Sequence, residues 1–158
     1  MMNPELKERR SPGMGMIVQT VIRWLKGPIL LFGIYIILYG HVAPGGGFGG
    51  GVVIASAFIL MTLAYGEPYT LEFFSRDTAL TLACIGLLIF VGLAWAGTWA
   101  GSGVFFDNLT AGMEGHRAHL FLTALEVGSG LFVTGALFMG FSVLMGHYGE
   151  DRDEEDEG

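Results

Sequence analysis

The sequence predicts an all-α integral membrane protein with four transmembrane helices. Of its 158 residues, 52% are hydrophobic and only 15% are charged, a balance that does not suit a soluble globular domain. The mean hydropathy of +0.56 points the same way. Four apolar segments approach or exceed the roughly 20 residues that a helix needs to cross a bilayer, so they are the predicted spans.

The first predicted span covers residues 17–39 and follows a polar, basic N-terminal extension, residues 1–16. Arg23 and Lys26 fall in its first third, so this end is expected to lie among lipid headgroups, with both side chains binding phosphates; an ion pair inside the protein is the alternative. The second predicted span, residues 49–65, is short for a bilayer. The glycine-rich segment before it is therefore expected to be an irregular loop that dips below the membrane surface.

The third predicted span covers residues 78–99 and the fourth covers residues 120–145, so the membrane domain as a whole is residues 17–146. Residues 147–158 hold seven of the fifteen acidic residues, a block that is typical of a disordered, solvated tail. An even number of spans places both ends on one side. Most Lys and Arg residues flank that side, which predicts that both termini are cytoplasmic.

The remaining composition argues against several other functions. A net charge of −7 gives no basis for binding nucleic acid. Cys84 is the single cysteine, so it can form no internal disulfide and cannot hold an iron–sulfur cluster. His116 and His119 are three residues apart, but no third ligand follows at a suitable spacing, so no metal site is predicted.

The segment between the first two spans reads His41-Val-Ala-Pro-Gly-Gly-Gly-Phe-Gly-Gly-Gly51 and holds six of the 26 glycines. Pro44 ends the preceding helix. A G-x-G-x-x-G match here has no strand before it, so nucleotide binding is not expected. The G-x-x-x-G spacing of the same glycines favours close helix packing. Phe48 either fills a gap beside the glycines or gates a water path.

This segment, from Tyr39 to Gly51, resembles the signature of the MnhB/MrpB family of small membrane subunits. The matching residues are His41, Pro44, Gly45, Gly46, Gly47 and Phe48. The last predicted span adds a looser match at Glu126-Val-Gly128, and the resemblance extends over about residues 18–145.

The resemblance implies an accessory, non-catalytic subunit of a multisubunit sodium/proton antiporter in the prokaryotic cell membrane. It would support or line the ion translocation path, carry no cofactor, and have lipid and the other Mrp/Mnh-type subunits as partners. One alternative is the related module of membrane-bound hydrogenase or sulfane reductase complexes, with redox subunits as partners. Another is a purely structural membrane scaffold.

Glu126 is the first candidate for an ion or proton pathway, because a carboxylate inside an apolar span is costly and by default functional. His119, Thr123 and Glu126 are spaced i, i+4 and i+7, so they share one helical face. The alternative for Glu126 is a hydrogen bond that fixes its helix against a neighbour. His41 either carries protons, since imidazole titrates near neutral pH, or caps carbonyl groups freed by Pro44.

Overall fold

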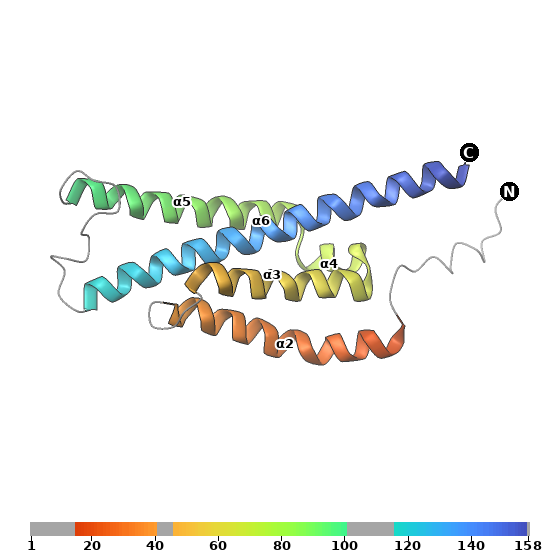
Figure 1. Ribbon diagram of the computed structural model, residues 1–158, viewed down its shortest axis with the longest axis horizontal. Helices are drawn as coiled ribbons and strands as arrows, with labels where there is room; N and C mark the ends of the chain where they lie inside the picture. The colour runs from red at the N-terminus through yellow and green to blue at the C-terminus, as the bar shows by residue number, and fades with distance from the viewer. Residues whose placement is uncertain (1–14, 41–45, 101–115, 158) are drawn as a thin grey trace.

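The computed structural model describes residues 15–40, 46–100 and 116–157, and within them it is all-helical. Figure 1 shows the helices, which are α2 (Met16–Tyr39), α3 (Gly46–Tyr65), α4 (Glu67–Phe73), α5 (Arg76–Ala100) and α6 (His116–Glu157). Four stretches are long and apolar enough to cross a membrane: Met16–Tyr39, Gly46–Tyr65, Arg76–Ala96 and His119–Gly146. The predicted all-α fold with four helices able to span a membrane is therefore confirmed.

The four long helices form an open row in the order α5, α6, α3, α2 (Figure 1). Helices α3 and α6 run in the same direction, and α2 and α5 run opposite to them. The central helix α3 is the most buried of the four spans, whereas α2 and α5 lie at the edges and expose large hydrophobic side chains along their lengths. Those side chains need lipid or protein to cover them.

Each helix pair in the row meets at glycines. An added Cβ at Gly51 would approach the Gly130 carbonyl oxygen to 2.6 Å, and one at Gly128 would approach the Gly86 carbonyl oxygen to 3.2 Å. The α2–α3 contact repeats the pattern between Gly33 and Gly50, again at 3.2 Å. Backbones this close leave no room for a side chain, so the close packing predicted for the glycine run is observed on both sides of α3.

The glycine run is helical rather than irregular where the structure describes it. The second span begins at Gly46 instead of residue 49, so the expectation of an irregular loop up to this span is wrong for residues 46–48. Glycine is a poor helix former, but Gly47, Gly50 and Gly51 are buried against neighbouring helices. Packing against α2 and α6 outweighs the low propensity and sets where the helix begins.

Two other elements differ from the sequence expectations. The short helix α4 was not expected; it follows Gly66, whose φ of 90° turns the chain, and has proline in its first turn, where the missing N–H does no harm. Helix α6 continues to Glu157 through the segment expected to be a disordered tail. Glutamate is a good helix former, so a helix that arrives at this segment can continue through it.

The end of the row that carries Arg23, Lys26 and Arg76 is tied across helices, and we call it the arginine end. The Tyr65 hydroxyl donates to the Gln19 carbonyl oxygen at 2.8 Å, joining α3 to α2. An Arg76 Nη2–H donates to the Ser142 carbonyl oxygen at 3.3 Å, joining α5 to α6. These bonds put the starts of α2 and α5 and the ends of α3 and the α6 span at one level.

Candidate functional site

Glu126 of α6 caps the beginning of α3. The N–H of Gly47 donates a hydrogen bond to the Glu126 carboxylate Oε2. Gly47 is the second residue of α3, so its N–H is one of the first four in the helix, which have no partner inside it. The positive end of the α3 dipole also faces this carboxylate. The acid thus provides both the acceptor and the charge that this helix start requires.

The carboxylate lies in a space that glycines leave open. A Cβ added at Gly46 would lie 2.7 Å from Glu126 Oε2, and one added at Gly40 would lie 3.0 Å from the same oxygen. Gly46 has a φ of 53°, a conformation that side-chain-bearing residues rarely adopt. The last turn of α2 and the first turn of α3 therefore both contact one carboxylate, and neither tolerates a side chain there.

The side of α6 that carries Glu126 faces α3. Ser129 Oγ donates to the Glu126 carbonyl oxygen at 3.0 Å, and Gly130 packs against the α3 backbone at Gly51. His119, by contrast, is exposed, and the Thr123 hydroxyl donates to the His119 carbonyl oxygen at 2.9 Å. The structure thus places the Glu126 carboxylate against the glycines at the start of α3, whereas the Thr123 hydroxyl bonds to the backbone of its own helix.

The structure describes only some of the motif residues. His41, Pro44 and Gly45 lie outside the described residues, whereas Gly46 and Gly47 form the site itself. Phe48 is 66% exposed, so the expectation that it fills a gap beside the glycines is wrong for this chain. Its neighbour Gly47 takes the position that faces α6, and a helix turns the next side chain by about 100°.

Thr134 is a polar contact that sequence reasoning missed. Its hydroxyl is buried between α3 and α6, within 3.2 Å of the Gly51 carbonyl oxygen and 2.8 Å of the Gly130 carbonyl oxygen. Thr134 lies eight residues after Glu126, close to the same helical face. A polar residue at that spacing inside an apolar span was the available signal.

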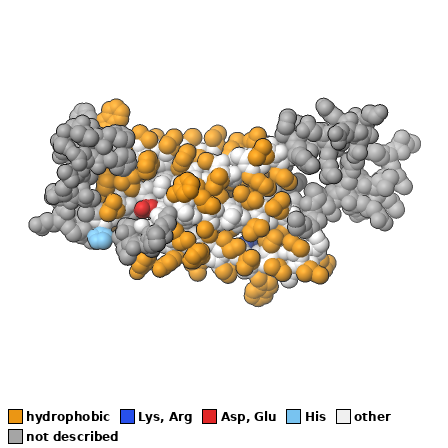
Figure 2. Space-filling view, in the orientation of Figure 1, with side chains coloured by type: hydrophobic (Ala, Val, Ile, Leu, Met, Phe, Trp, Pro, Cys, Tyr) orange, Lys and Arg blue, Asp and Glu red, His pale blue; other side chains and the backbone are white. Residues whose placement is uncertain are grey.

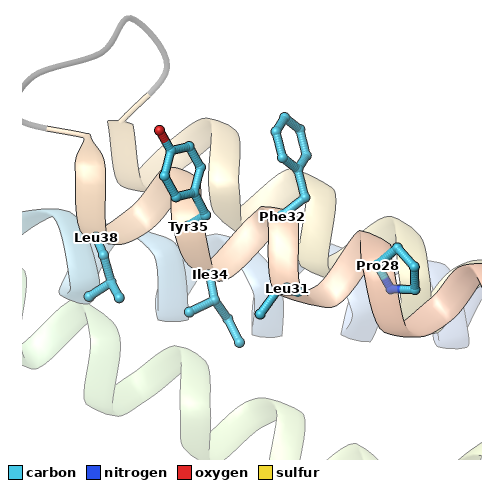
Figure 3. Close-up of a pocket in the computed structure, with 6 residues that line it drawn as sticks. All are labelled: Pro28, Leu31, Phe32, Ile34, Tyr35 and Leu38. Atoms are coloured by element: carbon cyan, nitrogen blue, oxygen red, sulfur yellow. The ribbon is translucent and has the colours of Figure 1, made fainter.

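The outer side of α2 carries a groove of about 570 Å³ that is apolar throughout (Figure 3). Its lining residues all belong to α2 and are Pro28, Leu31, Phe32, Ile34, Tyr35 and Leu38. In Figure 3 the Tyr35 hydroxyl points away from the helix axis. Among the described residues that line it none is charged, so this groove offers no ligand for an ion.

On the face drawn in Figure 2, the red of Asp and Glu appears at one place among the described side chains, surrounded mainly by orange hydrophobic side chains and white atoms. Glu126 is only partly buried, although it lies inside the span His119–Gly146. Four membrane spans joined through glycines, with a single carboxylate holding two helix ends together, define a multi-pass membrane protein with broad surfaces left for lipid and other proteins.

Comparison with known proteins gives the family. Residues 17–144 match the domain related to the MnhB subunit of the Na⁺/H⁺ antiporter, so the chain belongs to the MnhB family. It is 34% identical over 124 residues to the antiporter subunit mnhB2 of Staphylococcus epidermidis RP62A, covering 77% of this chain and 87% of the relative. The mnhB2 protein of Staphylococcus aureus MRSA252 is similar to the same extent. In Staphylococcus saprophyticus the mnhB2 similarity is 40% over 75 residues, or 48% of this chain and 53% of the relative.

This chain is therefore an MnhB-like subunit of the Na⁺/H⁺ antiporter family, as its glycine motif indicated. The relatives are subunits of a multisubunit antiporter, which implies other Mnh subunits as partners.

Proposed function

We propose that this chain is a non-catalytic, cofactor-free subunit that supports the ion path of a sodium/proton antiporter in a prokaryotic cell membrane. The observation that carries this proposal is the bond from the Gly47 N–H to the Glu126 carboxylate. It locks the start of α3 to α6 at the place where α2 and α3 converge. Glu126 acts here as a brace for the helix ends.

The brace acts on the family motif. The carboxylate contacts Gly40 at the end of α2 and Gly46 and Gly47 at the start of α3. These residues border the segment that contains His41 and Pro44. Because Glu126 holds the end of α2 and the start of α3 against α6, it fixes the two points between which this segment runs. Any ion path that uses the segment depends on that placement.

A second role for the same residue is to exchange protons or sodium ions itself, together with His119 and Thr123 on the same helix. The observation that favours it is that Glu126 is only partly buried. A sealed carboxylate would suit only the brace. His41 is the further candidate for this pathway.

Two substitutions separate these roles when they are introduced into the assembled complex. Glu126→Gln keeps an acceptor oxygen for the Gly47 N–H and removes the charge, whereas Glu126→Ala removes both. The brace predicts that the Gln variant retains most sodium/proton exchange in membrane vesicles and that the Ala variant loses most of it. If the Gln variant is inactive while its complex assembles and melts normally, Glu126 carries ions. If both variants exchange ions normally, the chain is a scaffold in which Glu126 is dispensable.

The parent complex is identified by gentle detergent extraction of the native chain and mass spectrometry of the proteins that co-purify. We expect antiporter subunits alone. Redox subunits of the hydrogenase or sulfane reductase type among them would instead assign the chain to a redox-driven ion pump.

A further inference from the structure

The groove on the outer side of α2 runs along the helix between two rims of side chains (Figure 3). Phe32 and Tyr35 point to one side of the helix, whereas Ile34 and Leu38 point to the other. The lining begins at Pro28 and ends at Leu38, ten residues later, which is about 15 Å along the helix. The groove is therefore an apolar trough that follows the length of the edge helix.

Arg23 lies in line with one rim of this groove. It precedes Ile34 by 11 residues, which are three helical turns plus about 20°, so the two side chains lie on the same side of α2. Arg23 also precedes Pro28 by five residues, which places it about 8 Å beyond the end of the groove that is nearer the arginine end. Its side chain is exposed. The groove therefore has a cation just past one end.

Lys26 lies on a different face of α2, the face that packs against α3. It is seven residues from both Gln19 and Gly33, and seven residues return a helix to within about 20° of the same direction. The Gln19 Nε2–H donates to the Ala64 carbonyl oxygen of α3 at 3.2 Å, and a Cβ added at Gly33 would lie 3.2 Å from the Gly50 carbonyl oxygen. Lys26 is accordingly half-buried. The structure thus separates the two basic residues of the first span.

Exposed aromatic side chains place the lipid headgroups at the level of Arg23. Its neighbour Trp24 is 80% exposed. One turn before Arg23, the Gln19 carbonyl oxygen accepts the hydrogen bond from Tyr65, whose ring stacks on that of Tyr69 at 4.8 Å, and Tyr69 is itself exposed. Trp and Tyr side chains gather where the acyl chains of a bilayer meet the headgroups. The groove, which lies further along α2, is therefore level with the acyl chains.

An anionic phospholipid suits both the cation and the groove with one molecule. Among the side chains that the structure describes, no carboxylate pairs with Arg23. A phospholipid carries its phosphate at the headgroup level and its acyl chains directly below, where the groove is apolar. A helix of another subunit would also cover the groove, but it would have to bring a separate carboxylate to the level of Arg23. A zwitterionic lipid brings its own ammonium group, so a lone guanidinium favours a lipid of net negative charge.

We propose that Arg23 binds the phosphate of an anionic phospholipid and that one acyl chain of this lipid lies in the α2 groove. The guanidinium group matches two phosphate oxygens at once, and the bonds are charge-assisted. The bound lipid covers the edge of the row that the other helices leave open. This proposal goes beyond the antiporter role and does not depend on Glu126.

The test places the photoreactive residue benzoylphenylalanine at Ile34 in the assembled complex, in vesicles of equal parts phosphatidylglycerol and phosphatidylethanolamine. Mass spectrometry of the labelled chain identifies what the probe has joined. We expect lipid adducts in which phosphatidylglycerol is favoured about fivefold, the factor that one basic side chain gives near a membrane surface. Arg23→Gln should remove this preference, whereas the matched control Lys26→Gln should keep it. The same probe at Leu88, which is 74% exposed on α5, should show no preference.

Three results would overturn the proposal. Adducts of the Ile34 probe with another subunit would make this face of α2 a protein interface. Equal adducts with the two lipids, or a preference that survives Arg23→Gln, would show that Arg23 does not select the lipid. Loss of the preference in Lys26→Gln but not in Arg23→Gln would assign the phosphate to the wrong residue.

Discussion

Adding a single methyl group at Gly51 should separate α3 from α6. The Cβ of Gly51→Ala would lie 2.6 Å from the Gly130 carbonyl oxygen and 3.0 Å from Val133 Cβ, where ordinary contacts start at 3.4 Å. The carbonyl belongs to a helix backbone and cannot turn aside. The two helices must therefore move apart by about 0.8 Å at this point.

The cost follows from the contacts that this separation disturbs. Overpacking of a close contact costs about 1–3 kcal/mol. The bond from the Thr134 hydroxyl to the Gly51 carbonyl oxygen, already 3.2 Å, is lengthened as well, while that hydroxyl keeps its bond to Gly130. Alanine returns up to about 1 kcal/mol through its better helix propensity. The weakened Thr134 bond, worth about 1 kcal/mol, offsets this gain, so the net expectation is a loss of about 1–3 kcal/mol of stability.

The assay is thermal unfolding of the purified complex, followed by intrinsic fluorescence, with Gly49→Ala as the matched control. Gly49 belongs to the same glycine run, but an added Cβ there meets nothing within 4 Å. We expect Gly51→Ala to lower the melting temperature by roughly 3–8 °C, and Gly49→Ala to leave it unchanged or slightly higher. Equal melting temperatures for the two variants would refute the close approach of α3 and α6 at Gly51.

Two further predictions concern the arginine end and the orientation of the chain. Phe138 is fully buried, and the centroid of its ring lies 5.0 Å from that of Phe74 and 6.0 Å from that of Phe58. Phe138→Ala should therefore lower the stability by about 3–5 kcal/mol in the same unfolding assay. The control Leu137→Ala removes an exposed neighbouring side chain and should cost far less. A reporter enzyme that is active only in the cytoplasm, fused after residue 158, should be active, because most Lys and Arg residues flank the side of the membrane on which the termini lie. Activity of a reporter that works only outside the cytoplasm would reverse the predicted orientation.

Much of the fold could be predicted from the sequence because a bilayer leaves few choices. An apolar stretch of about 20 residues in a bilayer has to form its backbone hydrogen bonds within itself, so it becomes a helix, and its limits follow from composition. The predicted spans 17–39 and 120–145 lie within one residue of the long apolar helical stretches Met16–Tyr39 and His119–Gly146. The start of α3 was missed because composition treats the glycine run as a loop, whereas packing against two neighbours makes it a helix.

The candidate site could be predicted only in part. The sequence identified Glu126 as an unusual charge and the glycines as places of close approach, since both follow from residue type alone. It could not show that the two meet, because Glu126 and Gly47 are 79 residues apart and are joined only when α6 packs beside α3. The sequence could not predict that Phe48 is exposed either, since this depends on which face of α3 packs against α6. The sequence by itself determined the four long apolar helices through their hydrophobicity, and the tertiary structure alone decided which groups the Glu126 carboxylate contacts.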